Sequence, residues 1–134
     1  MDTTKIVLFQ NKEIRRELHN GEWWFSVIDV ISVLTESDRP RKYWSDLKKK
    51  LIEEGYIELS EKIGQLKLQS SDGKYYLTDC ANTETMFRIV QSIPSPKVES
   101  IKRWLAKTGF ERVQEIENPA ETLQAEQGKS LKKD

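Results

Sequence analysis

The spacing of apolar residues in the first third of the chain predicts strands followed by a helix. Short apolar runs at residues 5–9 and 13–19 are joined by polar residues, a pattern typical of a β-hairpin. Asn20 and Gly21 predict a second tight turn, after which the aromatic residues 23–25 predict another strand. Apolar residues then recur at helical intervals, at Val27, Val30, Ile31 and Leu34.

The next stretch predicts a second helix close behind the first. Polar residues 36–38 break the first helix, and either Ser37 or Asp38 is expected to cap the second. The second helix is predicted to extend to about Glu54, where Gly55 ends it. Two helices joined by about four polar residues have the spacing of a helix-turn-helix.

The second half of the chain predicts a hairpin and two long helices. Residues 64–70 and 75–78 alternate like strands on either side of a Ser-Asp-Gly turn at 71–73, so they predict a β-hairpin. Helices are predicted from about residue 81 to 92 and from 97 to 108, each with an apolar stripe that can be buried.

Together these elements predict a single α+β domain. Its fold would be a small antiparallel sheet with helix-turn-helix-like helices, a β-hairpin and C-terminal helices. Gly109 is expected to interrupt the last long helix, and a further short helix is predicted over residues 110–117. We predict that residues 1–119 form the domain and that residues 120–134, which are low in apolar content, form a polar tail or linker.

The overall composition limits the possible functions. The chain has 22 basic and 22 acidic residues, and a net charge of zero argues against a protein that coats nucleic acid without selectivity. Cys80 and His19 are the only residues of their kinds, so no internal disulfide and no usual zinc site can form, and we expect no metal and no cofactor. No apolar run is long enough to cross a membrane and no signal region opens the chain, so we expect a cytoplasmic location without membrane contact.

Acidic pairs are candidates for catalytic groups, as is a nucleophile pair of Cys80 and His19, although these two lie far apart in sequence. Glu53 with Glu54, or Glu111 with Glu115, could be taken as paired carboxylates. Neither pair is accompanied by a His, a Cys or a glycine-rich phosphate loop, so we expect no enzymatic activity. Glu111 and Glu115 lie one helical turn apart and are expected to form an exposed acidic face that binds a basic partner or another copy of the chain.

Residues 39–50, in the second predicted helix, depart most from the neutral average. Six of them are Lys or Arg, and only Asp46 opposes these charges. At about 100° per residue, the apolar residues of this helix fall on one side, namely Tyr43, Trp44, Leu47 and Leu51. A charged helix face is commonly only a solvated face. This one is almost single-signed and stands second in a helix-turn-helix pattern, which favours contact with phosphates and base edges.

We therefore predict DNA as the partner of this helix. The predicted contact residues are Arg39, Arg41, Lys42, Ser45, Lys48 and Lys49. The β-hairpin could add a wing that brings Lys67, Gln69 and Lys74 near the DNA, although it could equally be a sheet that closes the core. Lys74 is included among the predicted contacts because it could reach a phosphate, as could Arg39.

Several blocks, in this order and spacing, resemble the amino-terminal domain of the BRO family of phage antirepressor and baculovirus repeated-ORF proteins. The blocks are 24–30, 43–48, 72–74 with 78–79, 91–97, and 104–106 with 111–112 and 115–116. The resemblance covers about residues 4–120. It implies an α+β nucleic-acid-binding domain from a prophage or mobile element, associated with antirepression and transcriptional control, and it carries over no catalytic residues. Such domains are often followed by a second, variable domain.

Two functions stay open at this point. The first is a DNA-binding transcriptional regulator of antirepressor type. The second is a protein-interaction module that binds and inactivates a repressor without contacting DNA. A continuous positive surface would favour DNA, and an apolar patch beside an acidic helix would favour a protein partner. The late helices carry an apolar surface formed by Trp104, Phe110, Val113 and Ile116, which could serve as a dimer surface or as a docking surface for a repressor. We expect any homodimer to be weak.

Overall fold

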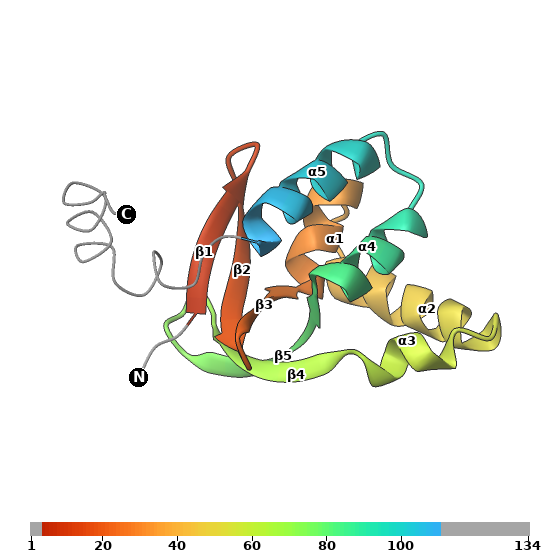
Figure 1. The fold of residues 1–134 in the computed structure, drawn as a ribbon, viewed down its shortest axis with the longest axis horizontal. Helices are drawn as coiled ribbons and strands as arrows, with labels where there is room; N and C mark the ends of the chain where they lie inside the picture. Colours follow the sequence, from red (N-terminus) through yellow and green to blue (C-terminus); the bar gives the residue numbers. More distant parts are fainter. Residues whose placement is uncertain (1–3, 111–134) are drawn as a thin grey trace, which may run out of the picture.

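The structure is a computed structural model that describes residues 4–110 (Figure 1). Its strands are β1 (Thr4–Phe9), β2 (Lys12–His19), β3 (Glu22–Ser26), β4 (Gly64–Gln69) and β5 (Tyr75–Asn82). Its helices are α1 (Val27–Thr35), α2 (Pro40–Glu53), α3 (Ile57–Glu61), α4 (Thr83–Gln91) and α5 (Val98–Gly109). The strands form one antiparallel sheet in the order β1-β2-β3-β5-β4, which confirms the predicted α+β fold.

Two tight turns fix the register of the first three strands. Gln10 and Asn11 join β1 to β2, and Asn20 and Gly21 join β2 to β3, all with positive φ between 50° and 81°. Two-residue turns with both φ angles positive match the right-handed twist of paired strands. The predicted turn at Asn20 and Gly21 is therefore confirmed, and the register places Ile14, Trp23 and Phe25 in the buried core.

The sheet is curled so far that its two edge strands approach each other. The backbone N–H of Gln69 in β4 donates to Oγ1 of Thr4 in β1 over 3.2 Å. Nη1 of Arg15 in β2 donates to the carbonyl oxygen of Gln69 over 3.2 Å. One end of the β4–β5 hairpin is thereby held against β1 and β2, although β3 separates these two strands from the hairpin in the strand order of the sheet.

Helices α1, α4 and α5 complete the core with the apolar stripes that the sequence predicts. Ser26 caps α1 by accepting a hydrogen bond from the backbone N–H of Asp29 over 3.3 Å. The buried residues of these helices include Val27, Val30, Ile31 and Leu34 of α1, Met86, Ile89 and Val90 of α4, and Ile101 and Leu105 of α5. Burial of these stripes against the sheet is the main stabilising contribution to the domain.

The structure corrects the prediction at the junction of β5 and α4. The strand was predicted to end at residue 78, but it continues to Asn82 because its last residues pair with β3, from Ser26↔Cys80 to Trp24↔Asn82. Asn82 then caps α4, since its Oδ1 accepts the backbone N–H of Thr85 over 3.0 Å. The helix predicted over about 81–92 is therefore present, and it begins at Thr83, slightly later than predicted.

Two other predictions differ from the structure or fall outside it. The short helix α3 was not predicted from the sequence. The last residue of α5 is Gly109, so this residue lies within the helix instead of interrupting it, and Phe110 caps the end. The predicted helix at 110–117 extends beyond the described residues, as do the domain end at residue 119 and the tail at 120–134.

Candidate nucleic-acid interface

Helix α2 begins and ends by different mechanisms. Arg39 occupies the N-cap position, Pro40 is the first helical residue, and no side chain caps the helix. The prediction that Ser37 or Asp38 caps it is therefore wrong. Instead, Oγ of Ser37 accepts the backbone N–H of Arg39 over 2.9 Å, just before the helix starts.

The C-terminal end of α2 agrees with the prediction. Gly55 has a φ of +98°, and its N–H donates to the carbonyl of Ile52 over 3.1 Å. The N–H of Tyr56 donates to the carbonyl of Leu51 over 2.9 Å. This pair of bonds is a Schellman motif, which needs a residue such as glycine in the left-handed region.

The two faces of α2 are divided as the helical spacing predicts. Trp44, Leu47 and Leu51 are buried in the core, and Tyr43 is half-buried beside them. On the opposite side, four predicted contact residues are exposed to solvent, namely Arg41, Lys42, Ser45 and Lys49. Together with the exposed Arg39 at the start of the helix, they form what we call the basic face.

The carboxylate of Asp79 connects α2 to the β4–β5 hairpin. Its Oδ2 accepts a hydrogen bond from Nε1 of Trp44 over 2.8 Å and pairs with Nζ of Lys48 over 3.1 Å. Its Oδ1 accepts a hydrogen bond from Nε2 of Gln65 over 3.1 Å. Burial alone would raise the pKa of Asp79, but these hydrogen bonds and the charge of Lys48 outweigh it, so the pKa lies below its usual value.

Lys48 therefore differs from the other predicted contacts. It is only partly exposed, its ammonium group is held by Asp79, and it lies over the ring of Trp44 at 5.6 Å from the centroid. A direct contact between Lys48 and DNA stays a prediction. Asp79 is not among the predicted site residues, because nothing in the local pattern around residue 79 indicates a partner 31 residues earlier.

The remaining charges on the basic face are available to a ligand. Within residues 4–110, the side chains of Arg39, Arg41 and Lys49 have no hydrogen-bond or ion-pair partner. Nζ of Lys42 pairs with Asp46 one turn along the helix over 3.0 Å, with both side chains well exposed. Exposed ion pairs of this kind contribute at most about 1 kcal/mol to the stability of the fold. Lys42 can therefore exchange Asp46 for a phosphate at little cost in free energy.

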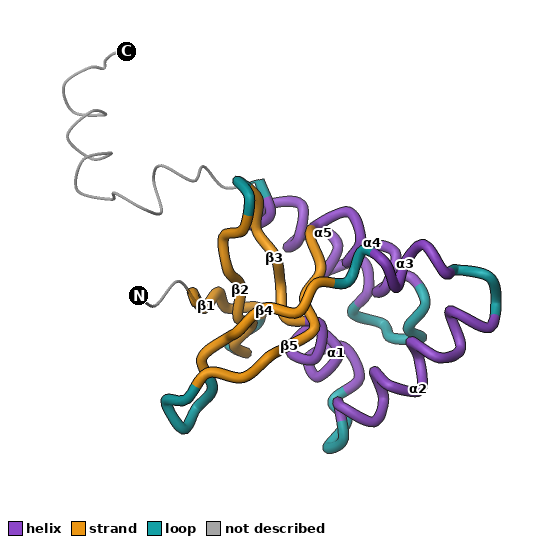
Figure 2. The backbone as a smooth tube through the Cα atoms, turned by 90° about the horizontal axis from the view of Figure 1, so that it is seen from below, coloured by secondary structure: helices purple, strands orange, loops and turns teal. Residues whose placement is uncertain are grey.

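Lys74 lies at a distance from the other predicted contacts. It stands at the tip of the β4–β5 hairpin, where its N–H donates to Oδ1 of Asp72 over 2.8 Å. Five residues of strand separate it from Asp79 beside α2, which corresponds to about 17 Å. The hairpin tip and the loop before α2 project from the same side of the molecule (Figure 2). A contact by Lys74 stays a prediction, and it would need a ligand long enough to span both segments.

Three further observations on residues 4–110 concern metal ligands, the thiol of Cys80 and membrane-spanning helices. Residues 4–110 contain no group of three or more His, Cys, Asp or Glu side chains placed to hold a metal ion. Cys80 is fully buried, and its burial raises the pKa of the thiol to about 12, which keeps it protonated at neutral pH. Among these residues there is also no helix of sufficient length and apolar character to span a bilayer.

Comparison with known proteins agrees with the resemblance seen in the sequence. The family model described as the BRO family N-terminal domain matches residues 13–111, from the start of β2 to the end of α5. The comparison with curated proteins and the comparison with solved structures gave no match. Since the family model covers well over half of the chain, including α2 and the hairpin, the chain belongs to the BRO family and carries its N-terminal domain.

Proposed function

We propose that this domain binds duplex DNA in the cytoplasm and acts as a transcriptional regulator of antirepressor type, with the basic face of α2 as its contact surface. The main supporting observation is that Arg39, Arg41 and Lys49 are exposed without a partner among the described residues, on a helix whose other face is buried. Membership of the BRO family supports the same function.

The position of α2 suggests a role for each group on the basic face. In helix-turn-helix proteins the residues near the start of the second helix contact base edges. Arg39 and Arg41 stand at this start, and the Arg fork suits guanine. Lys42 and Lys49 lie further along the helix and would neutralise phosphates, with Ser45 between them as a hydrogen-bonding group. Lys48 would position the helix through Asp79. No catalytic step is proposed.

Selection from a random duplex library tests the proposed function. We expect enrichment of a defined motif, since the exposed Arg residues offer direct base contacts. Arg41→Ala should lose this enrichment while keeping the wild-type melting temperature. Lys107→Ala removes an exposed positive charge from α5 and serves as the matched control. Failure to enrich any motif, or equal enrichment by Arg41→Ala, would contradict a sequence-reading function for α2.

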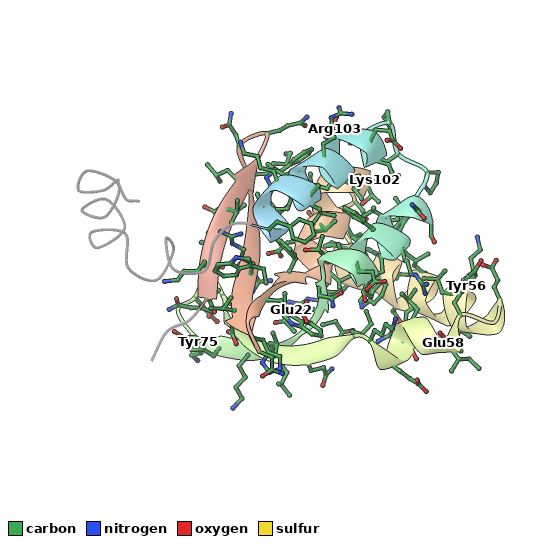
Figure 3. All side chains as sticks on the ribbon, viewed as in Figure 1. Glu22, Tyr56, Glu58, Tyr75, Lys102 and Arg103 are labelled. Atoms are coloured by element: carbon green, nitrogen blue, oxygen red, sulfur yellow. The ribbon has the colours of Figure 1, made fainter. Side chains whose placement is uncertain are left out.

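One observation favours the second candidate, a module that binds a protein partner. Three apolar side chains are exposed from the end of α2 to the start of α3, with Ile52 at 40%, Tyr56 at 54% and Ile57 at 56% exposure. The same segment and the rest of α3 carry four exposed carboxylates, namely Glu53, Glu54, Glu58 and Glu61. Tyr56 and Glu58 lie at the end of the molecule formed by α3 (Figure 3). We call these seven residues the acidic–apolar end. It would repel phosphate, and it suits a protein with basic and apolar side chains.

A pair of variants separates the two candidates. If the protein acts by binding a repressor, Ile57→Ser should abolish release of that repressor from its operator, and Arg41→Ala should have no effect. If the protein acts through DNA, Arg41→Ala should abolish release of the repressor and Ile57→Ser should have no effect. The repressor release assay should be run with both variants at matched concentrations, with circular dichroism confirming that each is folded.

Self-association through the late helices is less favoured by the described residues. Trp104 was predicted to contribute to such a surface, but it packs edge-on against Phe9 and donates its Nε1 hydrogen bond to the carbonyl of Leu8 over 2.8 Å. Phe110 is 75% exposed and available to a partner. The other predicted residues of this surface lie beyond residue 110, and a homodimer stays a prediction.

A further inference from the structure

Helix α2 carries a row of exposed side chains along its outer side. Four of its exposed residues follow one another at intervals of four, namely Arg41, Ser45, Lys49 and Glu53. Residues at this spacing are neighbours along one line on a helix surface. The exposed side chain of Ile52 lies beside this line, because residues 41 and 52 differ by about 20° around the helix axis. We call these five residues the outer row. Figure 2 shows α2 along the rim of the molecule, where none of the described elements covers its outer side.

The charge of α2 changes sign along the outer row. The first turn of the helix contains Arg41 and Lys42 and no acidic residue. The helix ends at Glu53 and Glu54, and Lys50 is the only basic residue of its last turn. Within residues 4–110, the side chains of both glutamates have no hydrogen-bond or ion-pair partner. Because a helix dipole is positive at the helix start, cations there do not stabilise α2, and contacts within the domain do not account for this charge pattern.

The outer row is complementary to the outer row of a second copy turned end to end. From Arg41 to Glu53 the helix rises about 18 Å, and the midpoint falls between Ser45 and Lys49. A twofold axis through this midpoint places Arg41 of one copy opposite Glu53 of the other, and the same pair recurs on the other side of the axis. Lys49 then lies opposite Ser45 of the other copy, so the two lysines are not directly opposed.

We propose that two copies of this domain associate through antiparallel packing of their α2 helices, with Arg41 of each copy paired to Glu53 of the other. Ile52 lies next to Lys42 of the other copy, whose hydrocarbon stem covers this apolar side chain. The contact is isologous, so it closes as a dimer and does not extend into a filament. It is distinct from the surface predicted on the late helices, since none of its residues belongs to α4 or α5.

The size of this contact limits its strength. Helix α2 has 14 residues and a length of about 21 Å. A single pair of helices of this length covers less than the roughly 1,200–2,000 Å² that a stable interface buries. Ion pairs between exposed side chains add little and are screened by salt. We therefore expect association only at high protein concentration and low salt.

The dimer has a consequence for DNA binding, and this consequence alone rests on the proposed function. Arg41 and Lys49 would contact DNA, and both are covered in the dimer. One copy cannot then hold duplex DNA and a second copy on α2 at the same time. DNA and self-association compete, and each weakens the other by the same factor. Free protein would be held back from DNA at high concentration.

The test uses two charge-reversed variants, Arg41→Glu and Glu53→Lys, alone and mixed. Sedimentation velocity at several protein concentrations, in low and moderate salt, measures self-association. Each variant alone places like charges opposite each other at both ends of the contact, so it should stay monomeric where the wild type associates. In an equimolar mixture, position 41 of each copy again lies opposite the reverse charge at position 53 of the other. The mixture should therefore associate as strongly as the wild type.

Lys107→Glu and Ile52→Ser serve as companion variants. Lys107→Glu changes the net charge by the same amount as Arg41→Glu, but on α5, and it should associate like the wild type. Ile52→Ser should weaken association without changing its salt dependence, because it removes an uncharged contact. Circular dichroism checks that each variant is folded. If Ile52→Ser does not fold, the mixture still decides the question, because Arg41 and Glu53 are both exposed.

Recovery of association in the mixture would support the antiparallel α2 dimer. The dimer is ruled out if the wild type stays monomeric at every concentration in low salt, or if the mixture associates no better than its components. It is also ruled out if the wild type is monomeric and a repressor binds it but not Glu53→Lys, since a protein partner then occupies the acidic end of the row.

Failure of this inference is distinguishable from failure of the proposed function. If the wild type binds duplex DNA but stays monomeric without it, the dimer is wrong and the proposed function stands. If the mixture recovers association but the wild type binds no duplex at any salt concentration, the proposed function is wrong and the dimer stands. If both hold, added duplex should dissociate the dimer, and a dimer that binds duplex without dissociating would contradict the α2 contact.

Discussion

Nε1 of Trp44 donates a hydrogen bond over 2.8 Å to Oδ2 of Asp79, and this bond joins the basic helix α2 to strand β5. It crosses 35 residues of sequence and lies at the base of the hairpin. Because the other face of Trp44 packs in the core, the bond fixes both the depth of the helix and its rotation. The outward direction of Arg41 and Lys49 depends on this attachment.

Replacement of Trp44 should therefore destabilise the fold. Trp44→Ala should lower the free energy of unfolding by about 3–5 kcal/mol, as large core truncations do. Trp44→Phe keeps most of the apolar volume but loses the hydrogen bond to a carboxylate, with an expected cost of about 1.5–3 kcal/mol. Urea denaturation measures both values.

Ser45→Ala is the control for these variants, since Ser45 is exposed and its change should stay within about 0.5 kcal/mol. A Trp44→Ala protein that unfolds like the wild type but no longer binds DNA would reverse the assignment of the two faces of α2.

The lowered pKa of Asp79 predicts a dependence of stability on pH. A carboxyl group with a lower pKa in the folded state stabilises the protein above its unfolded pKa of about 3.9, and this stabilisation is lost as the pH falls through the folded pKa. The difference in unfolding free energy between wild type and Asp79→Asn should thus be largest near neutral pH and shrink below about pH 4. Denaturation series at several pH values measure it. A difference that grows with acidity would contradict the ionised state of Asp79.

Gly109 predicts a coupling between the end of α5 and the start of α4. A Cβ atom at position 109 would overlap the side chain of Thr83, so Gly109→Ala should lower the free energy of unfolding by about 1–3 kcal/mol. In a Thr83→Ala background, where the overlapping hydroxyl and methyl groups are absent, the same substitution should lower it by less. A double-mutant cycle by urea denaturation measures this difference. An equal loss of unfolding free energy in both backgrounds would mean that the end of α5 and the start of α4 are not in contact at this point.

Cys80 offers a direct probe of opening of the sheet. Because it is fully buried and its pKa is raised to about 12, a thiol reagent at pH 8 should not label the native protein. Labelling should become complete in urea, and as the only cysteine it gives one unambiguous signal. Rapid labelling without denaturant would show that β5 opens from its pairing with β3.

Local patterns in the sequence predicted the elements whose partners are close in the chain. The apolar positions of α1 and α2 follow the helical period, so Trp44 and Leu47 were assigned to the core correctly. Turns at Asn20 and Gly55 were also identified, because a positive φ strongly restricts the residue type.

Local patterns do not reveal contacts that a distant partner decides. Helical spacing alone places Lys48 with the basic residues and does not show that Asp79 pairs with its ammonium group. Contact between Lys48 and DNA stays a prediction. The extension of β5 through Ala81 depends on pairing with Phe25, which outweighs the helical preference of alanine. Three-dimensional pairing of this kind leaves no mark in a single sequence.

The salt dependence of binding to duplex DNA tests the central claim most directly. If the basic face of α2 and the hairpin neutralise about four to six phosphates, log K should fall with log salt at a slope of roughly −4 to −5. The measurement is a titration of the wild-type protein against a random-sequence duplex pool between low and moderate salt. The account predicts that steep, linear loss of affinity. An affinity that stays constant over this range, or no binding at low salt, would contradict it.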